Sequence, residues 1–69
     1  MSLIPLTVNG EPREVPAGAT LAELVAELST APSGVAAALN ETVVPRGSWP
    51  RTPLTAGDRV EILTAVQGG

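Results

Sequence analysis

Apolar and polar residues alternate on both sides of Asn9-Gly10, a pair that favours a tight turn between antiparallel strands. Leu6 and Val8 share one face of the first segment, because strand side chains alternate with a period of two. We expect Pro5 at the start of that strand, since proline cannot donate to a ladder, and Pro12 favours an edge position for the second strand. The pattern predicts an amino-terminal β-hairpin.

A helix is predicted over Thr20–Leu28. Thr20 and Glu23 have the spacing of a capping box, in which each residue satisfies a backbone or side-chain group of the other at the start of a helix. The apolar residues that follow recur on one helix face: Leu21, Leu24, Val25 and Leu28. The Ser-, Thr-, Pro- and Gly-containing segment 29–34 ends the helix. So short a helix is stable only when it packs on another element.

A second hairpin is predicted after the helix. Val35, Ala37 and Leu39 alternate with smaller or polar residues, and Asn40-Glu41 is a plausible two-residue turn into the strand 42–44. Pro45 ends that strand.

The segment 46–56 has no regular period, and it contains Pro50 and Pro53. We expect a short helical turn around Trp49 and an anchoring contact of Leu54 with the core.

The clearest strand is the last one, Arg59–Val66, which follows a turn at Gly57-Asp58. It is the most hydrophobic strand and is therefore expected in the middle of the sheet. The order hairpin, helix, hairpin, strand predicts an α+β roll, with a mixed sheet of four or five strands and one main helix across it. The residues expected to be buried are Leu21, Leu24, Leu28, Leu39, Leu54, Val60 and Ile62.

Composition narrows the function of this 69-residue chain, which is expected to be one domain, residues 1–69. It has no cysteine, no histidine and no lysine, which excludes a thiol nucleophile, a Schiff-base lysine and a P-loop. A net charge of −3 argues against nucleic acid as a partner. No apolar run is long enough for a membrane span and no signal peptide is apparent, so a cytoplasmic location is expected. A carrier or binding domain, monomeric when free, is easier to build from these residues than an enzyme.

The pair Gly68-Gly69, preceded by Gln67, is the most informative feature. Glycines lose the most backbone entropy when ordered and add no apolar area, so they contribute nothing to packing. Gln67–Gly69 would instead make a thin flexible tail with a reach of about 10 Å. Such a tail could enter a narrow channel of another protein and present the Gly69 carboxylate as the reacting group. The alternative interpretation is a frayed end without function.

The chain resembles the ThiS-type sulfur carriers of thiamine biosynthesis, within the ubiquitin-like β-grasp superfamily. The resemblance covers the chain from Pro5 onward, and Met1–Ile4 is interpreted as a short extension. The residues and motifs that carry it are Val8-Asn9-Gly10-Glu11, Thr20-Leu21 with Leu24 and Leu28, Ala38-Leu39-Asn40, Val44-Pro45-Arg46 with Trp49, Leu54, Gly57-Asp58, Val60-Glu61-Ile62 and Gly68-Gly69. Singly these motifs are weak, but at these spacings in so short a chain they are specific.

The resemblance implies a sulfur relay centred on Gly69. An adenylyltransferase similar to ubiquitin-activating enzymes would use ATP and magnesium to adenylate the Gly69 carboxylate. A persulfide loaded by a cysteine desulfurase would displace AMP, and the resulting thiocarboxylate would pass its sulfur to thiazole synthase. The carrier itself would have no catalytic residue, no metal and no bound cofactor.

Several alternatives share parts of this pattern. The small subunit of molybdopterin synthase has the same fold and chemistry, but it tends to be longer and to carry a proline pair where this chain reads Thr64-Ala65-Val66-Gln67. A carrier for cysteine or thiouridine synthesis is a further possibility. A ubiquitin-like protein modifier, joined to target lysines through Gly69, belongs to another class, and so does a plain interaction domain with an unreactive tail.

Four further residues are candidates for a partner surface. Trp49 either covers the edge of the small core or lies partly exposed at an interface, where tryptophan is favoured. Arg46 is either a solvated charge or an ion-pair partner for another protein. Leu63 is out of phase with the buried positions of its strand and is expected on the open face of the sheet, which ubiquitin-like proteins use for docking. Val66 is grouped with it.

Overall fold

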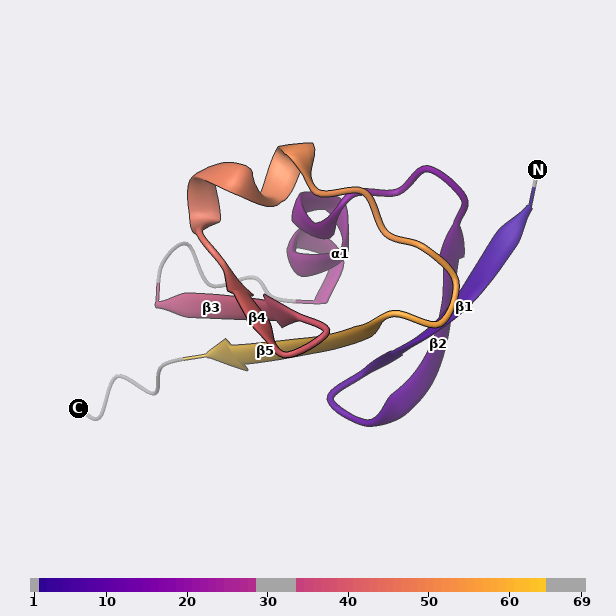
Figure 1. Cartoon of the computed structure of the whole chain (residues 1–69), viewed down its shortest axis with the longest axis horizontal. Helices are drawn as coiled ribbons and strands as arrows, with labels where there is room; N and C mark the ends of the chain where they lie inside the picture. The colour runs from indigo at the N-terminus through magenta and orange to yellow at the C-terminus, as the bar shows by residue number, and fades with distance from the viewer. Residues whose placement is uncertain (1, 29–33, 65–69) are drawn as a thin grey trace.

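The computed structural model describes residues 2–28 and 34–64, which form a five-stranded mixed sheet with one α-helix across it. Figure 1 shows α1 on one face of the sheet and a short 3₁₀ helix, η1, beyond it. The elements in chain order are β1 Leu3–Val8, β2 Glu11–Pro16, α1 Leu21–Leu28, β3 Val35–Leu39, β4 Thr42–Val44, η1 Arg46–Arg51 and β5 Arg59–Thr64. The predicted fold class is confirmed, and so are the predicted elements, the last strand as far as Thr64, where the described residues end.

The strand order is β2-β1-β5-β3-β4, which places β5 in the middle as its hydrophobicity predicted. β5 runs parallel to β1 and antiparallel to β3, and both hairpins are antiparallel. Asn40 and Glu41 have φ angles of 50° and 71°, so the second hairpin uses the two left-handed residues of a type I′ turn although neither is glycine. β2 is an edge strand, as Pro12 indicated.

The first strand is longer than the sequence suggested. Leu3 and Ile4 were assigned to an extension, but they are the first residues of β1 and pair with Pro16 and Val15. Pro5 therefore lies inside β1. The carbonyl oxygen of Pro5 accepts a hydrogen bond from the Gly57 N–H at 2.7 Å. The nitrogen of Pro5 points to the same side of β1, where β5 has not yet begun. The absence of an N–H at Pro5 therefore removes no hydrogen bond from the sheet.

The start of α1 has the predicted capping box. The Thr20 backbone N–H donates to Glu23 Oε1 at 2.8 Å, and the Glu23 N–H donates to Thr20 Oγ1 at 3.3 Å. The segment after η1 lies beside this helix start, because Leu21 N–H donates to the Thr52 carbonyl oxygen and Leu54 N–H to that of Ala19. The second of these bonds brings Leu54 into the core, as expected.

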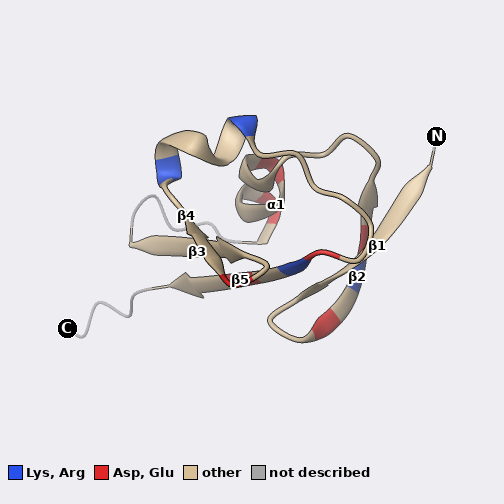
Figure 2. Ribbon diagram, in the orientation of Figure 1, with Lys and Arg blue, Asp and Glu red and all other residues tan. Residues whose placement is uncertain are grey.

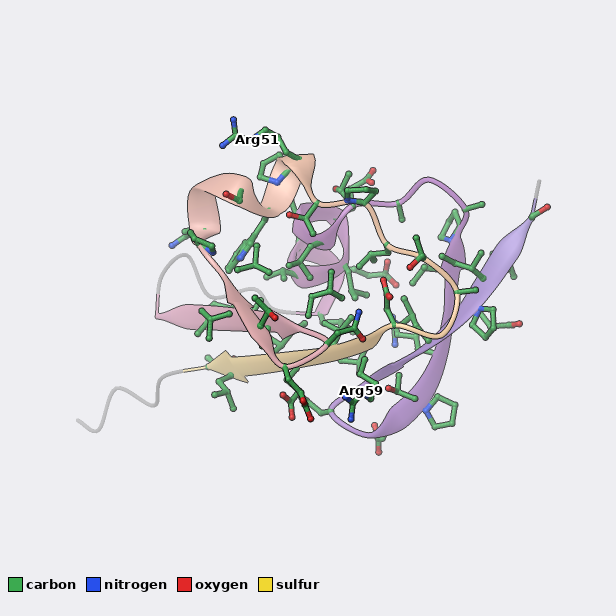
Figure 3. The ribbon with its side chains drawn as sticks, viewed as in Figure 1. Arg51 and Arg59 are labelled. Carbon is green, nitrogen blue, oxygen red and sulfur yellow. The ribbon has the colours of Figure 1, made fainter. Side chains whose placement is uncertain are left out.

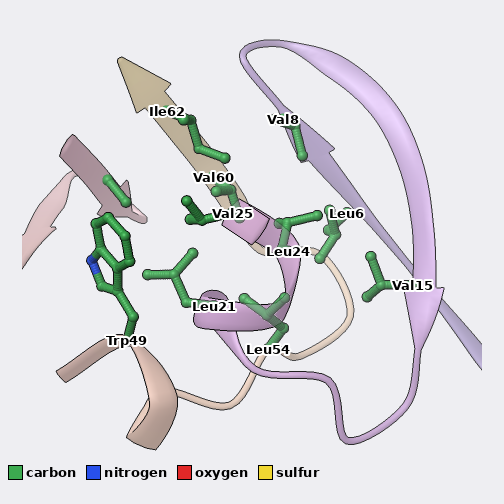
Figure 4. Packing of buried hydrophobic residues seen from close by; sticks show 11 residues of the cluster. Leu6, Val8, Val15, Leu21, Leu24, Val25, Trp49, Leu54, Val60 and Ile62 are labelled. Carbon is green, nitrogen blue, oxygen red and sulfur yellow. The ribbon is translucent and has the colours of Figure 1, made fainter. Parts of the chain in front are cut away.

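The core lies between α1 and the sheet (Figure 4). Its buried members are Leu6, Val8, Val15, Leu21, Leu24, Val25, Ala37, Trp49, Leu54, Val60 and Ile62. Leu39 packs against this cluster and is only partly buried. The expectation that Leu28 is buried is wrong. Leu28 is the last residue of α1 and 38% exposed, because it faces a hollow that it lines together with residues of the sheet strands β1, β2 and β5.

Candidate functional site: the end of β5 and the open face of the sheet

The predicted reactive tail, Gln67, Gly68 and Gly69, lies outside the described residues, and so does Val66. The structure does describe β5, the strand that leads toward them and ends at Thr64. β5 has neighbours on both sides, and Val60 at its centre is 1% exposed. The strand that precedes the tail is therefore built into the middle of the fold.

Two asparagine side chains hold β5 from its two sides. Asn9 and Asn40 each occupy the first position of a hairpin turn, with φ angles of 52° and 50°. The carboxamide of Asn9 is bonded to the backbone of Ile62, and the Oδ1 of Asn40 accepts the N–H of Arg59 at 2.9 Å. Sequence reasoning identified both residues as turn formers only, because a turn motif says nothing about where its side chain reaches in the fold.

Asp58, at the start of β5, is buried and fully hydrogen-bonded. Its carboxylate accepts bonds from the Thr55 N–H at 2.8 Å, the Thr55 hydroxyl at 2.9 Å and the Asn40 amide at 3.1 Å. Burial acts to raise the pKa of Asp58, but these three hydrogen bonds outweigh it and hold the pKa below its ordinary value. Asp58 shapes the turn before β5, as predicted from its place after Gly57.

The open face of the sheet carries an apolar patch beside the end of β5. Leu63 is 70% exposed, as its phase in the strand predicted, and Ala36 of β3 lies opposite it. Val43 of β4 is 73% exposed and lies opposite Ala38. We call these four residues the open-face patch: Ala36, Ala38, Val43 and Leu63. They line one hollow together with Asn9 and with Glu41 and Glu61, and the two glutamates give it an acidic rim.

Val43 and the rim glutamates were not singled out from the sequence. The alternation of β4 offered a signal, because Val44 packs on the core and its neighbour Val43 must then point to the other face. The rim is partly neutralised, since Arg59 forms an exposed ion pair with Glu41 at 3.3 Å. Figure 3 labels Arg59, the first residue of β5.

Trp49 and Arg46 do not join this patch. Trp49 is 6% exposed and belongs to the core, so the first of its two interpretations holds. The Arg46 guanidinium lies 5.7 Å from the centre of the Trp49 ring, a cation–π distance. Both residues are on η1, which packs against α1 on the covered side of the sheet. Figure 2 shows the two basic residues of η1, Arg46 and Arg51, on that side.

The described residues contain no group of three or more His, Cys, Asp or Glu side chains placed to hold a metal ion. Within residues 2–28 and 34–64, no helix has the length and the apolar character needed to cross a membrane.

The fold matches the crystal structure of the thiamine biosynthesis protein ThiS from Geobacter metallireducens, with a TM-score of 0.78 and 35% identity over 96% of this chain and all of that one. The chain is thus a β-grasp domain of the ThiS type. Residues 6–69 match the ThiS family.

The curated relatives agree with this assignment. The sulfur carrier protein ThiS of Thermus thermophilus is 42% identical over 62 residues, which are 90% of this chain and 95% of that protein. A thiazole synthase of Magnetococcus marinus is 39% identical over 62 residues, and this chain spans only 19% of its length. The chain belongs to the ThiS family of sulfur carrier proteins of thiamine biosynthesis, which are carriers rather than enzymes.

Proposed function

We propose that this chain carries sulfur for thiazole formation on the carboxylate of Gly69. The observation that supports the proposal most directly is the family match, which runs from residue 6 through Gly68 and Gly69. The sequence contains no cysteine, so the sulfur needs an attachment point other than a side-chain thiol. A terminal carboxylate supplies one, and a glycine pair before it lets the group enter a narrow channel.

The first step activates the carboxylate, which is a poor electrophile at neutral pH. A Gly69 carboxylate oxygen attacks the α-phosphorus of ATP in the partner adenylyltransferase, the bond from that phosphorus to pyrophosphate breaks, and pyrophosphate leaves with magnesium. The product is an acyl-adenylate, in which AMP is a good leaving group.

The second step exchanges oxygen for sulfur. The terminal sulfur of a protein persulfide, loaded by a cysteine desulfurase, attacks the acyl carbon of Gly69, and the carbon–oxygen bond to AMP breaks. A thiol then attacks the cysteine sulfur of the resulting acyl disulfide, the sulfur that is not bonded to the acyl carbon of Gly69. The sulfur–sulfur bond breaks, the thiol is oxidised to a disulfide, and Gly69 is left as a thiocarboxylate.

Thiazole synthase is the proposed acceptor of this sulfur. Support comes from the Magnetococcus marinus thiazole synthase, which includes a segment similar to this chain within one polypeptide. A carrier segment joined to the acceptor has a high effective concentration at the acceptor's site, which favours transfer between the two.

The open-face patch is the proposed docking surface for these partners, with Val66 next to it along the chain. Leu63 and Val43 are exposed large hydrophobic residues, and they lie on the face that α1 leaves uncovered. The acidic rim of Glu41 and Glu61 favours a partner surface with an apolar centre and arginine or lysine around it. Arg46 remains a candidate for a separate ion pair with a partner on the η1 side.

Mass spectrometry of the intact protein tests the carrier function. The chain ending at Gly69 is incubated with ATP, magnesium, the activating enzyme and a sulfur source, and its mass should rise by the difference between sulfur and oxygen. A chain without Gly69 should fold equally well, because no core residue is lost, and should gain nothing. Its carboxylate falls about 3.5 Å short, and a displacement of 1 Å can cost about 100-fold in rate. Equal loading of the two chains would contradict the proposal.

A further inference from the structure

Both polar atoms of the Asn9 side chain are bonded to the backbone of one residue of β5, Ile62. The Oδ1 of Asn9 accepts the Ile62 N–H at 2.9 Å, and its Nδ2 donates to the Ile62 carbonyl oxygen at 3.2 Å. Asn9 stands at the tip of the first hairpin, so these bonds join the beginning of the chain to the strand that precedes the tail.

The two bonds extend the parallel pairing of β1 with β5 beyond the point where β1 ends. Val8 is the last residue of β1 and pairs with Val60. The Asn9 N–H still donates to the Val60 carbonyl oxygen at 2.8 Å, and the chain then turns away. Ile62 lies past this turn, and the Asn9 carboxamide takes the place that a further residue of β1 would have had. On the other side β3 pairs with β5 as far as Thr64.

Asn40 provides an internal comparison, because it has the same turn conformation and the same kind of contact. Its backbone N–H donates to the Arg59 carbonyl oxygen at 2.8 Å, and its side chain bonds the Arg59 N–H and the Asp58 carboxylate. The two asparagines differ in the part of β5 that they contact. Asn40 holds the first residue of β5, whereas Asn9 holds Ile62 near the described end of the strand.

We propose that Asn9 is a positioning residue for the carrier reaction. Its carboxamide holds the end of β5 from the β1 side and thereby fixes the point and direction from which the tail starts toward the active site of the partner. The inference rests on the proposed function of Gly69. Without the two bonds, β3 alone would hold the end of β5, and the tail would start from a wider range of positions.

The expected consequence is a slower reaction at unchanged docking. Asn9 lines the same hollow as the open-face patch, but both polar atoms of its side chain are bonded to Ile62 and it supplies no apolar anchor. We therefore expect its removal to change the affinity of the carrier for its partner little. A reactive group that reaches its position less often lowers the rate of the bound complex. Since a displacement of 1 Å can cost about 100-fold, we expect kcat for adenylation to fall about tenfold when the carboxamide is removed.

The test compares Asn9→Gly with Asn40→Gly. Glycine adopts the positive φ of both positions without strain, and both backbone N–H bonds to β5 are retained. Each variant therefore loses only a side chain that makes two hydrogen bonds to β5 or its preceding turn. Urea unfolding should show comparable losses of stability, and amide hydrogen exchange at Ile62 should accelerate in Asn9→Gly alone. Asn9→Asp, which keeps the shape and the acceptor but lacks the donor, is the second variant should Asn9→Gly fold poorly.

The kcat and KM of each variant are then measured in steady-state adenylation with ATP, magnesium and the activating enzyme, and these two constants test the role of Asn9. We expect Asn9→Gly to lower kcat about tenfold and to change KM less than about twofold. The kcat of Asn9→Asp should lie between those of Asn9→Gly and the parent chain. Asn40→Gly should keep the kcat of the parent chain. Equal kcat values for the two glycine variants, or an effect of Asn9→Gly on KM alone, would overturn it. If the parent chain itself is not adenylated, the proposed function fails, and the role of Asn9 fails with it. If the parent chain is adenylated and the variants do not differ, only the role of Asn9 fails.

Discussion

The indole Nε1 of Trp49 donates a hydrogen bond of 2.9 Å to the carbonyl oxygen of Val44. This bond joins η1 to β4, an edge strand only three residues long. The same indole ring fills the core between η1 and α1 (Figure 4). The only aromatic side chain in the sequence thus serves two purposes, because its ring is buried and its polar atom is satisfied.

The substitution Trp49→Phe should separate these two contributions. A phenyl ring would keep most of the apolar contact but lose the donor, which leaves the Val44 carbonyl oxygen without this partner. We expect the free energy of unfolding to fall by about 1–3 kcal/mol, and Trp49→Ala to cost about 3–5 kcal/mol because it also leaves a cavity. Urea unfolding followed by circular dichroism measures both. Equal losses for the two variants would show that the hydrogen bond, not the ring, carries the stability.

Leu24 and Leu28 lie one helical turn apart on α1 and should respond very differently to truncation. Leu24 is 2% exposed, so Leu24→Ala should cost about 2–5 kcal/mol. The free energy of unfolding of a domain of this size is only about 3–5 kcal/mol, so this variant should be largely unfolded. Leu28 is 38% exposed, so Leu28→Ala should lower the free energy of unfolding by about 1 kcal/mol or less. Thermal melting of the two variants checks the pair, and a greater loss for Leu28→Ala would contradict the structure.

Asp58 should make the fold sensitive to acid. Burial acts to raise its pKa, but hydrogen bonds from Thr55 and Asn40 outweigh burial, so the pKa in the folded chain lies below the ordinary value of about 3.9. A lowered folded-state pKa means that this contribution to stability is complete above about pH 4 and is lost as the pH falls through the folded pKa. Asp58→Asn should therefore be less stable than the parent at pH 7, and the difference should shrink in acid.

Denaturant titrations of both chains from pH 7 to about pH 2 measure this difference directly. The exposed carboxylates contribute equally to the two chains and cancel. A difference that stays constant over the whole range would show that Asp58 acts through its shape rather than its charge.

Local sequence patterns predicted the elements because each is governed by contacts near in sequence. The capping box of Thr20 and Glu23 and the turn at Asn9-Gly10 require only neighbouring residues, and both are present. The central position of β5 followed from its hydrophobicity. The period of α1 predicts a buried Leu28, but a period gives only the direction of a side chain around the helix and not whether the space between it and the sheet is filled.

The candidate site was harder to predict because it depends on contacts between distant residues. The exposed position of Leu63 followed from alternation within one strand. Its grouping with Val43 required the register of two further strand pairs, which the sequence does not state. The reach of Asn9 to Ile62 spans 53 positions and depends on β1 ending where it does. The tail itself was identified from composition and family resemblance, and its residues lie outside those the structure describes.

Leu63→Ser tests the open-face patch as the docking surface, with Leu3→Ser as its matched control. Both leucines are exposed strand residues, at 70% and 59%, so neither change should affect folding much. Leu3 lies at the start of β1, at the far end of the molecule from the carboxyl end of β5 (Figure 1). Removal of one exposed apolar anchor from an interface typically weakens binding by about 1–2 kcal/mol, which corresponds to about tenfold.

We therefore expect Leu63→Ser to raise the KM of the carrier in adenylation about tenfold with kcat unchanged, and Leu3→Ser to leave both constants as in the parent chain. This pattern is the reverse of that expected for Asn9→Gly, because Leu63 contributes contact area whereas Asn9 contributes position. A partner with a basic rim should also bind less tightly at high salt, since Glu41 and Glu61 are exposed and their attraction is screened. Equal KM values for Leu63→Ser and Leu3→Ser would place the docking surface elsewhere.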